Sequence, residues 1–329
     1  MQEYDIIFRE FSRKKEMEIL TEIVPAYYED FQCIASACRH CCCIGWEIDI
    51  DEDTAAYYAA LPGELGARLR ENIIPGEPDC FRLTAEERCP FLNRDNLCEL
   101  ILTLGEDSLC EICTEHPRFH NRYGDREESG LGLCCEAAAA LILGQREPFS
   151  LKCFGDAPKD ADYLLRERVF AALTDRSLPL PVRFQSAAKL CGGRIAQRSP
   201  AEWLSRFLAL EQMEPAWTEL LHLLERNLEH IDFAAFSAAA ASWETEYELL
   251  ACYFVFRHFL NFAADYGAAA ALGFALLGCG LIYALHALRF QLDGALSFDA
   301  RAEIARLFSA EIEYSDENPA LLLEALSAD

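Results

Sequence analysis

Apolar residues recur at helical spacing along most of the chain beyond residue 156. The stretch "DADYLLRERVFAAL" at residues 160–173 has the 3.6-residue period of an amphipathic helix, and residues 214–228 and 243–266 continue that spacing. Neither a sustained alternation of polar and apolar residues nor an internal repeat is present. The pattern predicts a mainly α fold whose C-terminal half is nearly all helix.

Two of the expected helices carry start signals. In "RSPAEWLSRFLAL", Ser199 is the expected N-cap, Pro200 takes the first helical position, and Glu202 completes a capping box. In "ENPALLLEAL", Asn318 is the expected N-cap and Pro319 follows it. Both signals place a helix boundary independently of the apolar spacing.

One expected helix is apolar enough to raise the question of a membrane span. Residues 266–288 read "YGAAAALGFALLGCGLIYALHAL", which is long enough to cross a bilayer. The stretch is rich in alanine and glycine, contains His286, and has no second span beside it. These features favour a buried central helix over a membrane helix, so a membrane association is not expected.

The first half of the chain has a different residue pattern. It is punctuated by turn-forming stretches such as "LPGELG", "IIPGEPD", "LNRDN" and "RYGDREESG". We therefore expect an irregular, loop-rich Cys-rich module over residues 1–155, packed on an α-helical domain over residues 156–329. The cleft between the two domains is the expected ligand site.

Charge and the N-terminus limit the possible functions. The 29 basic and 55 acidic residues give a formal net charge of -26, which disfavours nucleic-acid binding and is typical of a solvated acidic surface. The stretch "MQEYDIIFREFSRKKEMEIL" lacks the apolar core of a signal peptide. We therefore expect a cytoplasmic protein, in which structural disulfides are rare.

Cysteine is the most informative residue type. Thirteen of the 16 cysteines lie between Cys33 and Cys153, while Cys191, Cys252 and Cys279 follow singly in apolar surroundings and are expected to be core residues. The densest stretch, "CIASACRHCCCIGW", begins at Cys33. A second group comes from "CPFLNRDNLC", "CEICTEHPR" and "GLGLCCEAA". So many thiols in a chain without an export signal indicate a metal site or redox chemistry.

The spacing does not choose the metal. Thiolates are ligands for zinc, copper(I) and iron-sulfur clusters, and more than eight thiols could hold one four-thiolate centre with spares or two centres. The spacing differs from the CxxxCxxC of radical S-adenosylmethionine enzymes, because Gly45 would occupy the third position, and from bacterial ferredoxins. No HExxH and no dinucleotide-binding glycine motif is present, and His116 and His120 flank Pro117.

These cysteine motifs resemble the flagellin lysine-N-methylase family, which belongs to a wider group of cysteine-cluster proteins described as zinc or iron chelators. The similar stretches are "PAYYEDFQCIASACRHCCCIGWEIDID", "CPFLNRDNLCEL", "CTEHPR", "LCCEAAAALIL" and "EIEYSDENPALLLEAL". They follow the family order from about residue 20 to the end of the chain. The first stretch, with its Cys-Cys pair followed by Gly45 and Trp46, is the most specific.

The resemblance also implies metal ligands. The family cysteines fall on Cys33, Cys38, Cys42, Cys43, Cys89, Cys98, Cys113 and Cys134. Three further cysteines fall where relatives usually have other residues, which leaves the ligand set open: Cys41, Cys110 and Cys135. Pro117 and Arg118 match a family element in which His116 replaces the usual tyrosine.

The implied activity is transfer of a methyl group from S-adenosylmethionine to a lysine of flagellin or another lysine-bearing protein. The implied cofactor is an iron-sulfur cluster of the 4Fe-4S type, with zinc as the alternative. A neutral lysine amine is needed, and Glu47, Asp49, His116 and Tyr123 are candidate bases to which we assign no role. A non-catalytic zinc- or iron-chelating protein and a redox protein are the alternative functions.

Overall fold

The computed structural model describes residues 21–193 and 198–328, which form two compact units. The first, Gln32–His120, is called the thiol unit here. The second, the helical unit, combines residues 21–31 with the described residues from 121 onward. The compact units divide after residue 120, whereas the expected domain boundary follows residue 155. That domain boundary stays a prediction. The N-terminal stretch from which the lack of a signal peptide is inferred, residues 1–20, lies outside the described residues.

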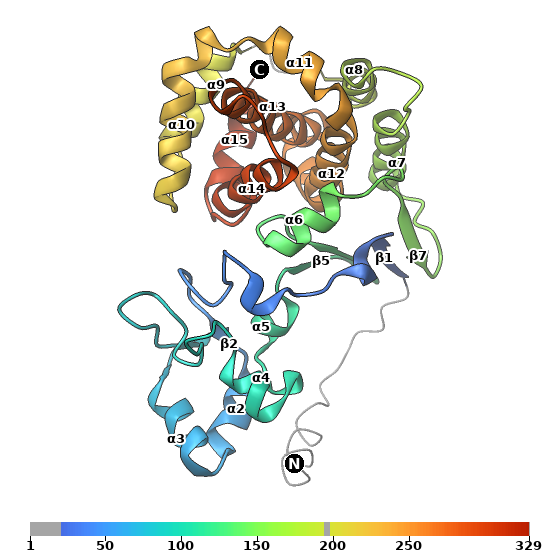
Figure 1. The fold of residues 1–329 in the computed structure, drawn as a ribbon. Coiled ribbons are helices and arrows are strands. Elements are labelled where there is room, and N and C mark those ends of the chain that lie inside the picture. Colours follow the sequence, from blue (N-terminus) through green and yellow to red (C-terminus); the bar gives the residue numbers. More distant parts are fainter. Residues whose placement is uncertain (1–20, 194–197, 329) are drawn as a thin grey trace. The chain divides into compact units, whose positions relative to one another are not determined.

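The helical unit carries the long helices of Figure 1. Helices appear where the apolar spacing predicts them, so that residues 160–173 correspond to α7 and residues 243–266 to α12. The mainly helical character of the C-terminal region is thus confirmed. The helices are α6 (Glu136–Leu143), α7 (Ala161–Leu173), α8 (Leu180–Leu190), α9 (Pro200–Ala209), α10 (Pro215–Asn227), α11 (Phe233–Ala240), α12 (Glu244–Tyr266), α13 (Ala268–Asp293), α14 (Phe298–Phe308) and α15 (Asn318–Ser327).

Helices α12 and α13 form the centre of the helical unit. Gly267 joins them with a φ of +85°, a conformation that glycine adopts without strain, and the two helices then pack along each other. Within the described residues, α13 is the one helix long and apolar enough to cross a membrane, with a hydropathy of 2.1 over its most apolar window. Of that window, 56% is buried inside the protein, so α13 contributes to the core of the helical unit.

A four-stranded sheet in the helical unit was not predicted. Its order is β5 (Arg118–Tyr123), β6 (Arg126–Leu131), β1 (Thr21–Pro25) and β7 (Leu151–Phe154), and β5 runs across the division between the units. Strand β1 pairs in parallel with β6 and antiparallel with β7. Both central strands are buried at consecutive positions, so they lack the polar–apolar alternation that marks a half-exposed strand.

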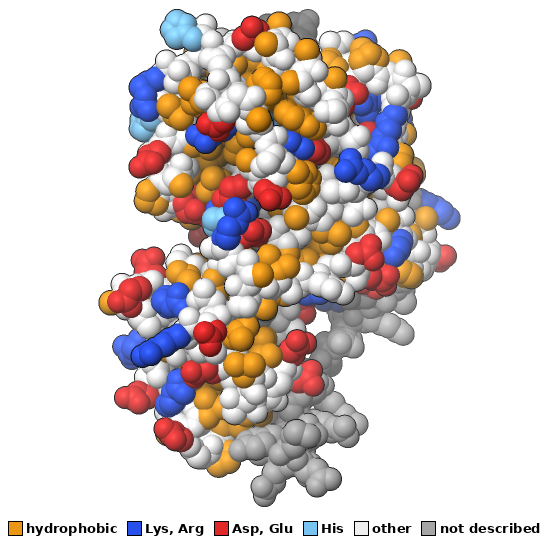
Figure 2. Space-filling view, viewed as in Figure 1, with side chains coloured by type: hydrophobic (Ala, Val, Ile, Leu, Met, Phe, Trp, Pro, Cys, Tyr) orange, Lys and Arg blue, Asp and Glu red, His pale blue; other side chains and the backbone are white. Residues whose placement is uncertain are grey.

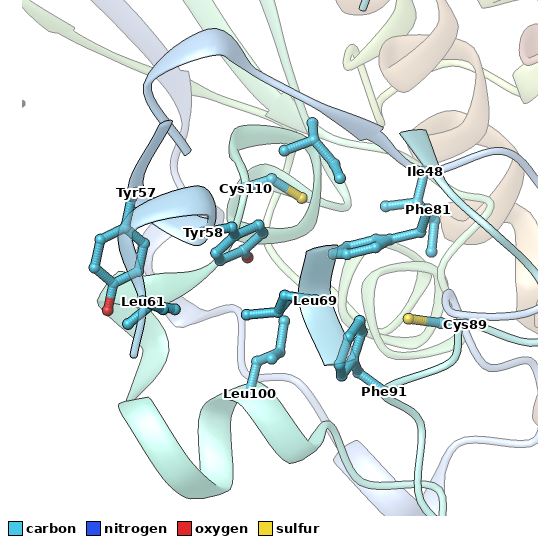
Figure 3. Close-up of a cluster of buried hydrophobic side chains, with 11 residues drawn as sticks. Ile48, Tyr57, Tyr58, Leu61, Leu69, Phe81, Cys89, Phe91, Leu100 and Cys110 are labelled. Carbon is cyan, nitrogen blue, oxygen red and sulfur yellow. The ribbon is translucent and has the colours of Figure 1, made fainter. Parts of the chain in front are cut away.

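The thiol unit is built from short elements around a core of its own. Its helices are α2 (Glu52–Ala60), α3 (Gly63–Glu71), α4 (Glu99–Leu104) and α5 (Glu111–Glu115). Its small antiparallel sheet has the order β2 (Asp49–Ile50), β4 (Asp79–Phe81) and β3 (Ile73–Ile74). Figure 3 shows the buried side chains between them, among which Phe81 and Phe91 have ring centroids 5.3 Å apart. Two of the buried side chains are the cysteines Cys89 and Cys110.

One of the two predicted helix starts is confirmed and the other is wrong. The Ser199 side chain accepts a hydrogen bond from the Glu202 N–H, and the Glu202 carboxylate accepts one from the Ser199 N–H, so the predicted capping box is confirmed. The prediction for Asn318 is wrong, because Asn318 is the first residue of α15 and Glu317 is the N-cap. The Asn318 amide is buried and instead donates to the carbonyls of Glu211 and Glu311 at 3.1 and 2.8 Å.

Charged side chains of both signs lie on the face of the molecule that Figure 2 shows. On the face seen in Figure 2, basic and acidic side chains are interspersed among apolar and uncharged ones. The full sequence has 29 basic and 55 acidic residues, which give the formal net charge of -26.

Candidate metal centre

Three consecutive thiols lie in one turn of the thiol unit. The Ile44 N–H donates to the Cys41 carbonyl at 3.2 Å, and the Cys89 N–H donates to the Cys43 carbonyl at 2.8 Å, which ties this turn to the loop carrying Cys89. The Cys43 thiol is hydrogen-bonded to the sulfurs of Cys41 and Cys42. This hydrogen bonding lowers the pKa of Cys41 to about 6 and raises the pKa of Cys43.

A second pair of thiols opens helix α5. Cys110 directly precedes the helix and Cys113 lies in its first turn, where the Cys113 N–H donates to the Cys110 carbonyl at 3.0 Å. The two thiols are hydrogen-bonded to each other, which lowers the pKa of Cys110 and raises that of Cys113. Cys110 is fully buried, so its partner replaces the water that an exposed thiol would contact.

Cys89 and Cys98 flank a tight turn. The Asn93 N–H donates to the Leu97 carbonyl at 2.9 Å, and the Glu99 N–H donates to the Phe91 carbonyl at 2.8 Å, so the two ends of the turn are drawn together. Burial raises the pKa of Cys89 to about 12 and raises the pKa of Cys98. Both thiols are therefore held in their neutral form.

The three groups of thiols lie near one another against the aromatic core. Charge on Cys98, Cys110 and Cys41 adds to the effect of burial in raising the pKa of Cys89, and charge on Cys42 acts in the same way on Cys98. Figure 3 shows Cys89 and Cys110 among the rings of the core. We call this set the thiol cluster, and its members are Cys41, Cys42, Cys43, Cys89, Cys98, Cys110 and Cys113.

The chemistry of the cluster suits a thiophilic metal. Thiol sulfur is the donor that iron-sulfur clusters and zinc share. Across residues 21–193 and 198–328, no three Cys, His, Asp or Glu side chains are arranged around one point as ligands of an ion. The thiols instead lie as hydrogen-bonded partners, and a metal would displace their protons on binding. The donor set therefore fits such a metal, while the coordination geometry would form on binding.

An aromatic pair lies beside the triple-cysteine turn. The Trp46 indole N–H donates to the Cys42 carbonyl, and the Trp46 ring lies 5.8 Å from the His116 ring between centroids. Burial lowers the pKa of His116 to about 4, so its imidazole is neutral at pH 7. Trp46 thus contacts both the turn and a neutral imidazole ring.

Cys134 lies in a different environment, within the helical unit. Its thiol is hydrogen-bonded to Tyr314, and burial raises its pKa to about 12. Gly132 makes room for this contact, because a Cβ atom at Gly132 would lie 2.3 Å from the Tyr314 hydroxyl and 3.2 Å from a guanidinium nitrogen of Arg257. The Arg257 guanidinium in turn lies 4.7 Å from the centroid of the Tyr314 ring.

The buried carboxylate of Glu313 anchors this second polar group. It accepts hydrogen bonds from the Tyr253 hydroxyl at 3.0 Å and from His258, and it lies 3.6 Å from the Arg257 guanidinium. Burial acts to raise the pKa of Glu313, but Arg257 and His258 outweigh it and hold that pKa below its usual value. Glu313 ends a π-helical turn, Ser309–Glu313, a distortion that recurs at functional sites.

Part of this chain is similar in sequence to known proteins. The flagellar biosynthetic protein FliU of Salmonella muenchen is 30% identical to it over 142 residues, which are 41% of this chain and 84% of the FliU protein. The chain belongs to the flagellin lysine-N-methylase family. Lysine-N-methylases of Salmonella choleraesuis and Salmonella typhimurium are also 30% identical to it over 142 residues. The chain spans only 35% of the length of each of these two relatives.

Other comparisons add no further relationship. No protein-family model matches the chain, and no solved structure matches it. The matched part is 41% of the chain, whereas the resemblance noted in the sequence was expected to extend from about residue 20 to the C-terminus.

The structure gathers five of the eight cysteines that match the flagellin lysine-N-methylase pattern: Cys42, Cys43, Cys89, Cys98 and Cys113. Cys33 is exposed, and its sulfur accepts a hydrogen bond from the Ala35 N–H at 3.4 Å. The Cys38 thiol donates to the His40 carbonyl at 3.2 Å. Cys134 lies in the helical unit beside Tyr314.

Two cysteines outside the family pattern, Cys41 and Cys110, belong to the thiol cluster. The third, Cys135, is the N-cap residue of α6. Arg257, His258 and Glu313 were not expected as site residues. Glu313 could have been found from the sequence, because it lies within the stretch "EIEYSDENPALLLEAL" that resembles the family. Arg257 and His258 lie on α12, outside the quoted motifs.

A cavity of about 260 Å³ in the helical unit was also not predicted. It is bordered by α8, α9, α10, α13 and α15, and aliphatic and aromatic side chains make up most of its lining. Arg198, one of its polar residues, stacks on Trp203 at 5.5 Å and donates to the Ala325 carbonyl at 3.3 Å. Such a lining would hold an apolar group and offers little for acid–base chemistry.

Proposed function

We propose that this chain transfers a methyl group from S-adenosylmethionine to the side-chain amine of a lysine, with flagellin as the first substrate to test. The supporting observation is its 30% identity over 84% of FliU, together with relatives named lysine-N-methylase. In the reaction, the bond between the sulfonium sulfur and the methyl carbon breaks while a bond from the methyl carbon to the lysine nitrogen forms. The lysine has to lose a proton first, because an ammonium group has no free electron pair.

The proposed metal is an iron-sulfur cluster, with zinc as the alternative. The thiols that both match the family pattern and belong to the thiol cluster would hold it: Cys42, Cys43, Cys89, Cys98 and Cys113. A bound iron-sulfur cluster would supply a group that can accept and donate one electron. The chain's own contribution is the buried aromatic core, which keeps water from several of these thiols.

A second candidate function is metal binding without methyl transfer. Cys89 and Cys110 are part of the hydrophobic core of the thiol unit, whose helices are nine residues or shorter. A metal held by such thiols would stabilise the fold of a unit with little regular structure, as zinc does in small domains. In that case the thiol cluster would be structural and the chain would serve as a binding protein.

The cytoplasm is the proposed compartment. All 16 cysteines are free thiols in the structure, and reduced thiols are maintained in the cytosol. The excess of acidic side chains supports a basic protein surface as the partner and disfavours nucleic acid. The partial burial of α13 supports a protein that is not anchored by this helix.

An isotope-transfer assay tests the proposed function. Protein purified without oxygen would be incubated with S-adenosylmethionine carrying a labelled methyl group and with flagellin, and labelled lysine would be sought by mass spectrometry. The matched control is flagellin whose lysine amines have been acetylated, which leaves no nucleophile. Label on unmodified flagellin alone is the expected result. Metal-loaded protein that labels neither flagellin nor other lysine-rich proteins would contradict methyl transfer and favour the binding protein.

A further inference from the structure

The thiol cluster contains two cysteines that the family pattern does not explain. Cys41 is hydrogen-bonded to Cys43, and Cys110 is hydrogen-bonded to Cys113. Each non-family thiol thus contacts a thiol that does match the family pattern. Cys134, which also matches the pattern, is hydrogen-bonded to Tyr314 in the helical unit.

We propose that Cys41 and Cys110 are metal ligands of this chain and that Cys134 is not, so that the thiol unit binds a thiophilic metal through its own sulfurs. This inference rests on the metal-binding part of the proposed function and is independent of methyl transfer. The ligand class is a soft cation, Zn²⁺ or the iron of an iron-sulfur cluster, since both take thiolate donors.

The sulfurs of the triple-cysteine turn contact one another directly. Cys43 is hydrogen-bonded to both Cys41 and Cys42, so three sulfurs lie within reach of one another in a single turn. A metal that took Cys43 as a ligand would have Cys41 as an immediate neighbour. Short loops that carry adjacent thiols are the usual means by which proteins wrap a metal.

Cys41 and Cys110 differ from the ordinary buried cysteines of the helical unit. Cys252 and Cys279 are also buried, but they lie on the helices α12 and α13 and behave as small apolar residues. Cys110 instead lies in a CxxC arrangement with Cys113, a spacing found in zinc sites. Cys41 is only partly buried, so apolar packing alone does not account for its place in the turn.

Cys134 lies among polar groups of the helical unit and not in the thiol cluster. Its thiol has a phenol as its hydrogen-bond partner, and the guanidinium of Arg257 lies next to both groups. A polar group that is already partnered by oxygen and nitrogen atoms gains less from a metal than a thiol whose neighbours are thiols. The number of sulfurs does not require Cys134, because the seven thiols of the cluster exceed the four of a Cys₄ site.

Metal binding by these thiols is a balanced exchange. Each thiol that becomes a ligand releases its proton to solvent and forms a bond from sulfur to the metal, with no change in oxidation state when the metal is Zn²⁺. The side chains have to turn toward a common point, since no such arrangement is present among the described residues. Thiols on turns and at a helix start can turn in this way without moving a long helix.

Cobalt titration of the full-length chain tests the inference. Metal-free protein, kept reduced, would be titrated with Co²⁺, whose absorption bands report bonds to thiolate sulfur, and Zn²⁺ would then compete for the site. The test variants are Cys41→Ser and Cys110→Ser. The matched controls are Cys134→Ser, which changes a family-pattern cysteine, and Cys153→Ser, which changes an exposed thiol of β7.

We expect Cys41→Ser and Cys110→Ser each to lose about a quarter or more of the cobalt–thiolate absorption and to bind Zn²⁺ at least about tenfold more weakly. We expect Cys134→Ser and Cys153→Ser to titrate like the unchanged protein. Titrations of Cys41→Ser and Cys110→Ser that match the unchanged protein would overturn the inference, as would a large loss for Cys134→Ser. If circular dichroism shows that Cys110→Ser does not fold, the titration of Cys41→Ser, at a partly exposed position, tests the inference by itself.

The isotope-transfer assay separates the two proposals. Metal binding that depends on Cys41, without any methyl transfer, would sustain the inference and contradict the proposed function. Methyl transfer by a protein whose metal binding is unaffected by Cys41→Ser would contradict the inference and leave the proposed function standing.

Discussion

The Cys43 thiol is hydrogen-bonded to the sulfur of Cys41, two residues earlier in the same turn. The contact joins a cysteine that matches the flagellin lysine-N-methylase pattern to one that does not. Because Cys43 is also hydrogen-bonded to Cys42, it occupies the centre of the three sulfurs. Cys43 is therefore the thiol of this turn that contacts both of its neighbouring thiols.

Replacement of Cys43 should affect metal binding more than replacement of a peripheral thiol. We expect Cys43→Ser to lower the metal content per chain by at least about half, because serine oxygen is a poor substitute for thiolate sulfur. We also expect the chelator-sensitive part of the thermal stability to disappear, since metal binding contributes to folding. Elemental analysis and thermal unfolding with and without chelator are the measurements. Cys153→Ser should behave like the unchanged protein in both, and an equal effect of the two variants would refute the central place of Cys43.

Glu313→Gln should destabilise the helical unit. The substitution removes a buried negative charge that faces Arg257 and His258, so we expect the free energy of unfolding at pH 7 to fall by about 3–5 kcal/mol. Because the pKa of Glu313 is lowered in the fold, its contribution is present above the unfolded pKa and is lost as the pH falls through the folded pKa. Urea unfolding is the measurement. Asp316→Asn, at an exposed position, is the control and should change the value by less than about 0.5 kcal/mol.

Two glycines of α13 should respond in opposite directions to alanine. A Cβ atom at Gly280 would have nothing within 4 Å, so Gly280→Ala should raise the free energy of unfolding by about 1 kcal/mol through helix propensity. A Cβ atom at Gly278 would lie 3.0 Å from the Phe308 ring and 3.2 Å from the Phe254 ring. Gly278→Ala should therefore lower the same quantity by about 1–3 kcal/mol. Equal effects of the two substitutions in urea unfolding would show that the packing around α13 differs from this description.

His286 should make the stability depend on pH. Its ring accepts a hydrogen bond from Tyr247 at 2.9 Å and donates one to the Arg301 carbonyl at 3.2 Å, and burial lowers its pKa to about 3. Since the unfolded chain takes up this proton more readily, stability is complete above the unfolded pKa of about 6.5 and declines as the pH falls toward 3. We expect His286→Gln to reduce that decline by up to about 1.4 kcal/mol per pH unit.

Urea unfolding at several pH values between 4 and 7 measures this slope. His222→Gln is the matched control, because the His222 side chain is 50% exposed on α10 and contacts Glu225 rather than the core. An unchanged slope in His286→Gln would mean that His286 is protonated in the folded protein.

The helices could be predicted because their signals are local. The apolar spacing of α7 and α12 and the capping box of Ser199 depend on residues a few positions apart. Asn318 was misassigned because its amide bonds to Glu211, more than a hundred positions away, which outweighs its local capping preference. The sheet escaped prediction for a similar reason, since buried β1 and β6 show no alternation and pair across a long sequence separation.

The candidate site could be predicted only in part. The number and spacing of the cysteines indicated a metal, and five of the eight expected ligands lie in the thiol cluster. Which thiols contact each other is set by how the turn carrying Cys41 pairs with the loop carrying Cys89. That pairing is a tertiary contact, so the motif spacing could not show that Cys41 and Cys110 join the cluster.

Metal and sulfide analysis of protein purified without oxygen tests the central claim most directly. The analysis would be combined with a count of the thiols that react with an alkylating reagent before and after chelation. We expect bound iron with inorganic sulfide, or bound zinc, and we expect the thiols of the cluster to be protected until the metal is removed. Protein that carries no metal, and whose cluster thiols react equally before and after chelation, would contradict the account.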